Sequence, residues 1–159
     1  MLSTIIRMIT TAWLFFMIIA SATPATAQTA RLGDLTFENA WLRATPPNAT
    51  VAAGYVMITN VGSSADRLIG VAAPFANKNE IHEMAMSGGV MQMRELPQGI
   101  LVQPGAQVVL KPGGLHFMFM HLQEPLLAGQ IWPVTLIFEK AGATALNMQV
   151  KKQAGGHNH

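Results

Sequence analysis

The sequence contains no cysteine among its 159 residues. The protein therefore has no thiol for a disulfide, a catalytic nucleophile, an iron–sulfur cluster or a blue-copper ligand set. Charge is also scarce, because Asp, Glu, Lys and Arg together make up 11% of the residues and leave a formal net charge of +2. A chain so close to neutral lacks the basic footprint of a nucleic-acid binder, so we expect no nucleic-acid partner.

Long apolar runs are absent except near the start of the chain. There, a lone Arg7 precedes an apolar run over residues 12–20, and the small residues Ala25-Thr26-Ala27 follow. This order is typical of a secretory signal peptide, and the run is shorter than the ~20 residues of a membrane span. We predict a signal peptide over residues 1–27 that is cleaved after Ala27, with no stable membrane insertion afterwards. An uncleaved membrane anchor is the alternative.

Helical periodicity is missing as well. Short apolar segments alternate instead with turns rich in Gly, Pro and Asn, a pattern typical of antiparallel sandwiches and barrels. We expect one domain over residues 28–150, opening with a short leader over 28–34, and a disordered tail over 151–159. The expected strands cover residues 35–43, 53–60, 66–71, 79–86, 90–96, 107–110, 115–121, 134–139 and 144–150.

Methionine, by contrast, is abundant, with 11 residues. After the signal, most of them fall into two segments, residues 82–93 and 116–121. The first segment is an expected hairpin, because Gly88-Gly89 suits a two-residue turn in which both central positions have a positive φ. Paired residues of a hairpin share a face. In this register that face carries a set of soft donors, namely His82, Met84, Met86, Met91 and Met93.

The second segment also separates its side chains by face. Alternation places His116, Met118 and Met120 on one side and Phe117, Phe119 and His121 on the other. Thioether sulfur and imidazole suit Cu(I), and the sequence has no carboxylate cluster of the kind that calcium or magnesium prefers. The competing interpretation is structural, since Met often fills irregular core gaps and a single His on an apolar strand is usually a satisfied core residue.

The spacing of these donors resembles the PCu(A)C family of periplasmic copper chaperones. The family signature is His, ten residues, Met, about twenty-one residues, then His-x-Met. Here His82 and Met93 keep the first spacing and His116-Phe117-Met118 the last element, while the second gap is one residue longer. We place the extra residue in an expected loop over 98–107. The likeness covers roughly residues 35–150, including the segments 40–47 and 111–120.

The resemblance implies a cupredoxin-like Greek-key β-sandwich and a Cu(I) site made of His82, Met93, His116 and Met118. It also implies a copper chaperone that acts in the periplasm. We expect a monomer and no enzymatic activity. The implied copper acceptor is the binuclear centre of cytochrome c oxidase subunit II, reached directly or through a Sco-type protein. The terminal His157 and His159 could bind Cu(II) weakly, although a disordered polar tail without a metal site is the favoured interpretation.

Two other functions stay open at this point. The chain could serve as a periplasmic copper-buffering or resistance protein, or as a sandwich that uses its Met-rich face to bind a partner without metal. A copper oxidase or reductase has less support, because the sequence has neither a Cys–His electron-transfer set nor a second metal cluster.

Overall fold

The computed structural model describes residues 29–152, and every helix or strand assigned in that range is a strand. The all-β prediction is therefore confirmed, and within these residues no helix could cross a membrane. The expected signal peptide lies outside the described residues, as do His157 and His159. The strands are β1 (Ala30–Leu32), β2 (Leu35–Arg43), β3 (Val51–Asn60), β4 (Asp66–Ala72), β5 (Ala76–Ser87), β6 (Val90–Glu95), β7 (Ile100–Val102), β8 (Gln107–Leu110), β9 (Leu115–Leu122), β10 (Ile131–Phe138) and β11 (Gly142–Lys151).

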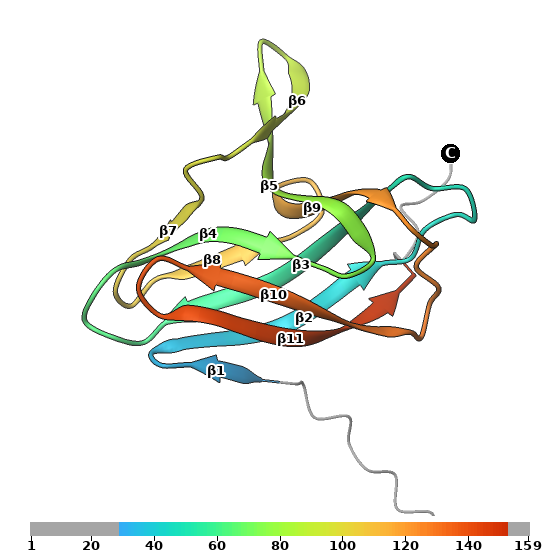
Figure 1. Ribbon diagram of the computed structural model, residues 1–159. Coiled ribbons are helices and arrows are strands. Elements are labelled where there is room, and N and C mark those ends of the chain that lie inside the picture. The colour runs from blue at the N-terminus through green and yellow to red at the C-terminus, as the bar shows by residue number, and fades with distance from the viewer. Residues whose placement is uncertain (1–28, 153–159) are drawn as a thin grey trace, which may run out of the picture.

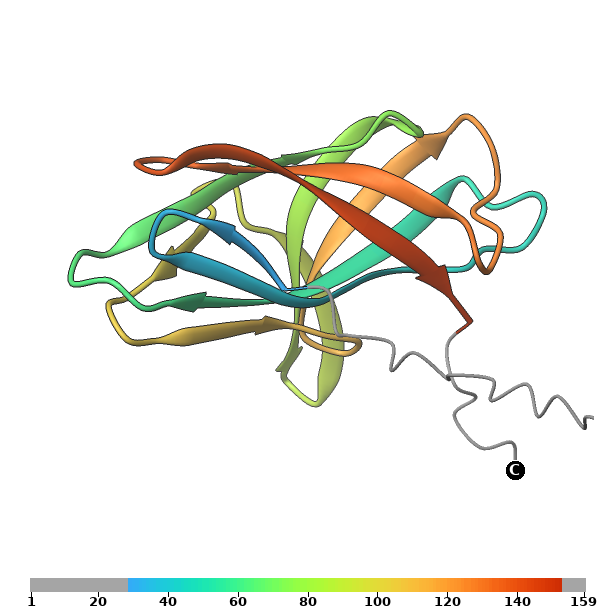
Figure 2. The same ribbon diagram turned by 90° about the horizontal axis from the view of Figure 1, so that it is seen from below.

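The strands join into one hydrogen-bonded sheet that folds over on itself. Its order is β6-β5-β9-β3-β2-β11-β10-β4-β7, with β1 beside β2 and β8 beside β3. Strand β3 pairs with β9 through residues 51–54 and with β8 through residues 56–59. Two layers result, with β4, β10 and β11 across from β2, β3 and β8 (Figures 1 and 2). Neighbours such as the parallel pair β2 and β11 are far apart in sequence, so the chain crosses between strands that are not consecutive, as the predicted Greek-key sandwich requires.

The core lies between the two layers and is rich in aromatic rings. Phe37 on β2 packs against Phe138 on β10 with ring centroids 5.8 Å apart, and Phe75 packs against Phe119 on β9 at 5.0 Å. Phe117 and Phe119 are fully buried. Because alternate residues of a strand face opposite sides, burying these two rings turns the other face of β9 outward. That outward face carries the predicted donors.

Two short strands are not predicted by the sequence pattern. β1 lies where a leader is expected and pairs with β2, and β7 lies inside the expected loop over residues 98–107 and pairs with β4. Each has three residues, which is too few for a period-two pattern to stand out from its surroundings. At the other end, β11 includes Lys151, the first residue of the expected tail.

Candidate metal centre

The methionine-rich segment after β4 forms the predicted hairpin. Strands β5 and β6 pair in the predicted register, with Met84 opposite Met93. The turn residues Gly88 and Gly89 have φ values of 59° and 79°, the left-handed pair that a two-residue turn of this type needs. β6 is the outermost strand at its end of the sheet, and the hairpin projects away from the two layers (Figure 1).

The two donor segments meet because β5 also pairs with β9. In this antiparallel pairing His82 lies opposite His116, and Glu80 lies opposite Met118. The two imidazole rings have centroids 5.8 Å apart and planes inclined by 53°. Directly opposed residues share a face. The donors of the hairpin and those of β9 therefore occupy one side of the sheet.

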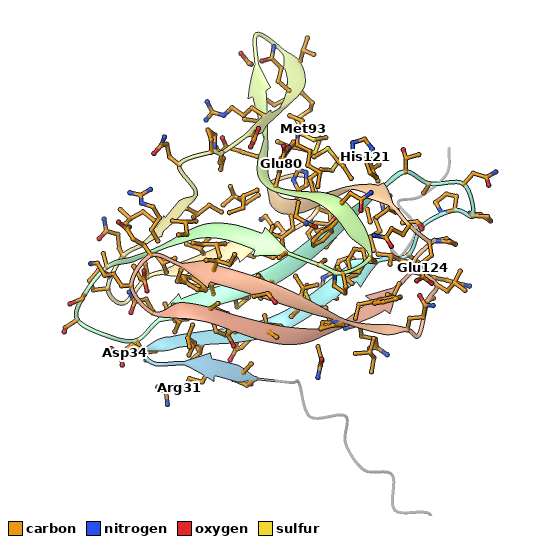
Figure 3. All side chains as sticks on the ribbon, in the orientation of Figure 1. Arg31, Asp34, Glu80, Met93, His121 and Glu124 are labelled. Carbon is orange, nitrogen blue, oxygen red and sulfur yellow. The ribbon has the colours of Figure 1, made fainter. Side chains whose placement is uncertain are left out.

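An open groove of about 540 Å³ lies on this side. Its lining residues include Met84, Met93, His116 and Met118, together with the segment 43–46 at the end of β2. Met93 thus reaches the same space as His116 and Met118 although it comes from the projecting hairpin. Figure 3 shows Met93 and Glu80 near the base of that hairpin. The exposed fraction falls from 48% at Met93 to 5% at His116, so the donors range from the open rim to the floor of the groove.

One ring nitrogen of His116 is held by the main chain. Its Nδ1 lies 2.9 Å from the carbonyl oxygen of Gly114. A carbonyl oxygen only accepts hydrogen bonds, so Nδ1 is the nitrogen that carries the proton. In the neutral ring, Nε2 then keeps the lone pair that a metal ligand needs.

His82, which lies beside His116 rather than on the groove wall, is held through the other nitrogen. Its Nε2 lies 2.7 Å from Oε2 of Glu80, and an ionised carboxylate only accepts, so Nε2 carries the proton. Its Nδ1 is buried and finds no hydrogen-bond partner among residues 29–152. A buried nitrogen without a partner costs free energy. A soft metal ion at Nδ1 would remove that cost, so the donor set here fits Cu(I).

Glu80 belongs to this site although the sequence analysis does not identify it. Hydrogen bonds from Lys78 and then from His82 hold the pKa of Glu80 below its ordinary value of 4.5, even though burial acts in the opposite direction. The carboxylate is therefore ionised at neutral pH while only 10% of the side chain is exposed. The sequence signal for it is alternation, since Lys78, Glu80 and His82 share one face of a strand.

Several of the predicted donors lie away from the groove. Met86 and Met91 at the hairpin tip are 64% and 47% exposed, and Met120 lies farther along β9, opposite Val51. Alternation predicts that His121 shares the face of Phe117 and Phe119, which the structure places in the core, and for His121 this prediction is wrong. His121 is exposed and has a φ of 54°, and a left-handed residue interrupts the pleat, so alternation no longer sets the direction of its side chain.

The donor set is selective by its chemistry. Within residues 29–152 no group of three or more Asp, Glu, Cys or His side chains is placed to hold a metal ion. Calcium and magnesium need such oxygen-rich sites. The groove instead collects thioether sulfur from Met93 and Met118 around imidazole nitrogen, which is a combination that suits a soft monovalent ion.

Comparison with known proteins places the chain in a family. Residues 35–150 match the family model described as LpqE-like, putative lipoprotein LpqE-like. The chain is 32% identical over 138 residues to the putative lipoprotein Lxx21020 of Leifsonia xyli subsp. xyli, a match that covers 86% of this chain and 82% of the relative.

Solved structures of PCuAC domains share the fold. The apo PCuAC domain from PmoF1 aligns with a TM-score of 0.67 at 26% identity, covering 79% of this chain and 100% of that one. The copper-bound PCuAC domain from PmoF2 aligns with the same TM-score and identity over 79% of this chain and 99% of that one. The Cu(I) form of DR1885 from Deinococcus radiodurans aligns at 0.63 with 27% identity over 84% and 87% of the two chains. The cupredoxin-like fold is thereby confirmed, and the chain belongs to the LpqE-like family of PCu(A)C type.

Proposed function

We propose that the protein is a copper chaperone that binds one Cu(I) through His82, Met93, His116 and Met118 and passes it to an acceptor protein. The observation that carries this proposal is that Met93, His116 and Met118 line one groove, and that the neighbouring His82 has a buried nitrogen with no partner in the described part of the chain. Thioether and imidazole donors match the softness of Cu(I). The copper-bound domain from PmoF2 and the Cu(I) form of DR1885 support the same cargo.

The four proposed ligands differ in how firmly they are held. His116 is buried and fixed to the carbonyl of Gly114, and His82 is fixed to Glu80. Met93 stands on the projecting hairpin with 48% of its surface exposed. An acceptor can therefore reach and replace the Met93 thioether first, while both imidazoles still hold the ion. Release by stepwise ligand exchange would begin at Met93.

We propose a periplasmic, monomeric protein that delivers copper to cytochrome c oxidase subunit II or to a Sco-type protein. The description of the relative from Leifsonia xyli as a putative lipoprotein supports a location in the cell envelope. A copper-buffering protein would share the binding site but would not deliver the ion directly.

Replacement of sulfur by carbon tests the ligand set. Met118→Leu keeps the apolar volume of the side chain but removes the sulfur donor. Met57→Leu on β3 is the matched control, because Met57 lies opposite Val109 and Glu38 and does not line the groove. Anaerobic competition with a Cu(I) chelator should show that Met118→Leu binds Cu(I) at least about tenfold more weakly than the wild type, which is a loss of about 1.4 kcal/mol or more in binding free energy. Equal affinities for the two variants would refute the proposed ligand set.

Transfer is measured separately. The Cu(I)-loaded protein is mixed with an apo copper domain of oxidase subunit II, and native mass spectrometry follows the ion. A chaperone delivers copper in the presence of a chelator that captures free Cu(I), because the ion passes within a protein–protein complex. Transfer that the chelator abolishes would favour the buffering function.

A further inference from the structure

We infer that Lys78 and Glu80 are positioning residues of the copper site, which fix the ring of His82 so that Cu(I) meets its Nδ1, whereas His116 offers Nε2. The copper part of this inference rests on the proposed function. The orientation of the His82 ring does not, because it can be measured in the protein without metal.

Both oxygens of the Glu80 carboxylate are engaged on the same face of β5. Oε1 is ion-paired with Nζ of Lys78, and Oε2 lies 2.7 Å from Nε2 of His82. The side chains of Glu80 and His82 are only 10% and 12% exposed, whereas Lys78 is 57% exposed. Rotation of the carboxylate would break at least one of these contacts. The lysine therefore anchors the carboxylate, and the carboxylate anchors the imidazole.

This anchoring decides which nitrogen of His82 is free. A neutral imidazole has one N–H, and the carboxylate can only accept it, so the proton stays on Nε2. The lone pair then lies on Nδ1, the buried atom that no other described residue contacts by a hydrogen bond. Metal-binding histidines commonly hold their second nitrogen to a carboxylate or carbonyl in this way, which orients the ring and raises its basicity.

The two histidines are thus oriented by different means. A main-chain carbonyl, that of Gly114, holds Nδ1 of His116, and a side chain holds Nε2 of His82. Substitution can remove only the second of these supports. Glu80 is itself a poor ligand for Cu(I), because a carboxylate oxygen is a hard donor and both of its oxygens are already bonded.

The first test needs no copper. Nitrogen-15 spectra of the histidine rings in the apo protein should show His82 with its proton on Nε2 and His116 with its proton on Nδ1. Glu80→Ala should give His82 a mixture of the two tautomers and leave His116 unchanged. A proton on Nδ1 of His82 in the wild-type protein would overturn the inference, whatever the outcome of copper binding.

The second test is the affinity for Cu(I) under chelator competition. Loss of a carboxylate behind a metal-binding histidine typically weakens metal binding by about 10–100-fold, and we expect a loss in that range for Glu80→Ala. Glu80→Gln should lose less, because its carbonyl oxygen can still accept the proton of Nε2. The matched control is Glu83→Ala, since Glu83 is adjacent to His82 but pairs with Arg94 at 2.6 Å on the other face.

A structural role for Glu80 is separated from the positioning role by a double-variant cycle. If Glu80 acts through His82, then Glu80→Ala should cause no further loss of Cu(I) affinity in a His82→Ala background. If Glu80→Ala weakened Cu(I) affinity by the same factor in both backgrounds, the inference would be overturned. Wild-type Cu(I) affinity in the single variant Glu80→Ala would overturn it as well. If the wild-type protein bound no Cu(I) but showed the expected tautomers, the proposed function would fail while the orientation by Glu80 stood.

Discussion

His116 and Phe117 are neighbours in the chain and face opposite sides of β9. Phe117 is fully buried between the layers, whereas His116 lines the groove together with Met118. The apolar core therefore fixes the position of two of the proposed copper ligands. Changes that shift β9 within the core should affect Cu(I) binding without touching a donor.

Gly54 on β3 offers a direct test of this coupling. A Cβ at Gly54 would lie 2.9 Å from Cε2 of Phe119 and 3.1 Å from Cδ2 of Leu42, and both side chains are fully buried. We expect Gly54→Ala to lower the free energy of unfolding by about 1–3 kcal/mol, measured by urea denaturation, and to weaken Cu(I) binding. The control is Gly70→Ala on β4, where the nearest atom to an added Cβ is 3.5 Å away. Equal stability of the two variants would contradict the packing argument.

The hairpin turn gives a second prediction. Gly89 has a φ of 79°, and left-handed backbone costs an L-residue about 1–2 kcal/mol, with β-branched residues the least suited. Gly89→Val should therefore disturb the register that places Met93 opposite Met84 and weaken Cu(I) binding. The same strain should lower the free energy of unfolding by up to about 1–2 kcal/mol, which the urea midpoint measures. Gly88→Asn is the control, since Asn tolerates this conformation, and it should bind Cu(I) as the wild type does.

The sequence predicts the local parts of the site better than the long-range ones. Alternation and the Gly-Gly turn determine the hairpin register, because both act between residues close in the chain. The pairing of His82 with His116 depends on β5 lying beside β9, a contact between distant segments that the sequence analysis obtained only through family resemblance. The sequence does not reveal Glu80, because a carboxylate near a histidine resembles any solvated charge until its burial is known. The sequence also does not reveal the orientation of His121, because a left-handed residue leaves no pattern in the alternation.

A buried carboxylate far from the groove predicts how stability depends on pH. Asp66 accepts hydrogen bonds from the backbone N–H groups of Arg67, Lys140 and Ala141 at 2.7, 3.0 and 2.9 Å. Burial by itself raises the pKa of Asp66, but these bonds outweigh it and hold the pKa below the ordinary value of 3.8. A depressed folded-state pKa means that the stabilisation is complete above the unfolded-state value and is lost as the pH falls through the folded-state value.

Asp66→Asn should therefore reduce stability most at neutral pH. The amide has one acceptor oxygen and no charge, so we expect a loss of about 1–3 kcal/mol in the free energy of unfolding at neutral pH. The difference from wild type should shrink as the pH is lowered below 3.8, the unfolded-state value. Urea denaturation of both proteins across this range measures the difference. A constant difference would mean that ionisation of Asp66 does not contribute.

The last prediction separates binding from delivery at the hairpin tip. Met86 and Met91 lie opposite each other beyond Met93, and their side chains are more than 45% exposed where the hairpin projects (Figure 1). An acceptor that approaches Met93 from solvent meets these thioethers first, so they can hold the ion during exchange without belonging to the resting site.

In the double variant Met86→Leu, Met91→Leu, Cu(I) affinity should be unchanged while transfer to the acceptor domain slows. Met93→Leu, by contrast, should weaken affinity itself. Weakened affinity in the double variant would place the tip residues among the ligands, and an unchanged transfer rate would leave them only a shielding role.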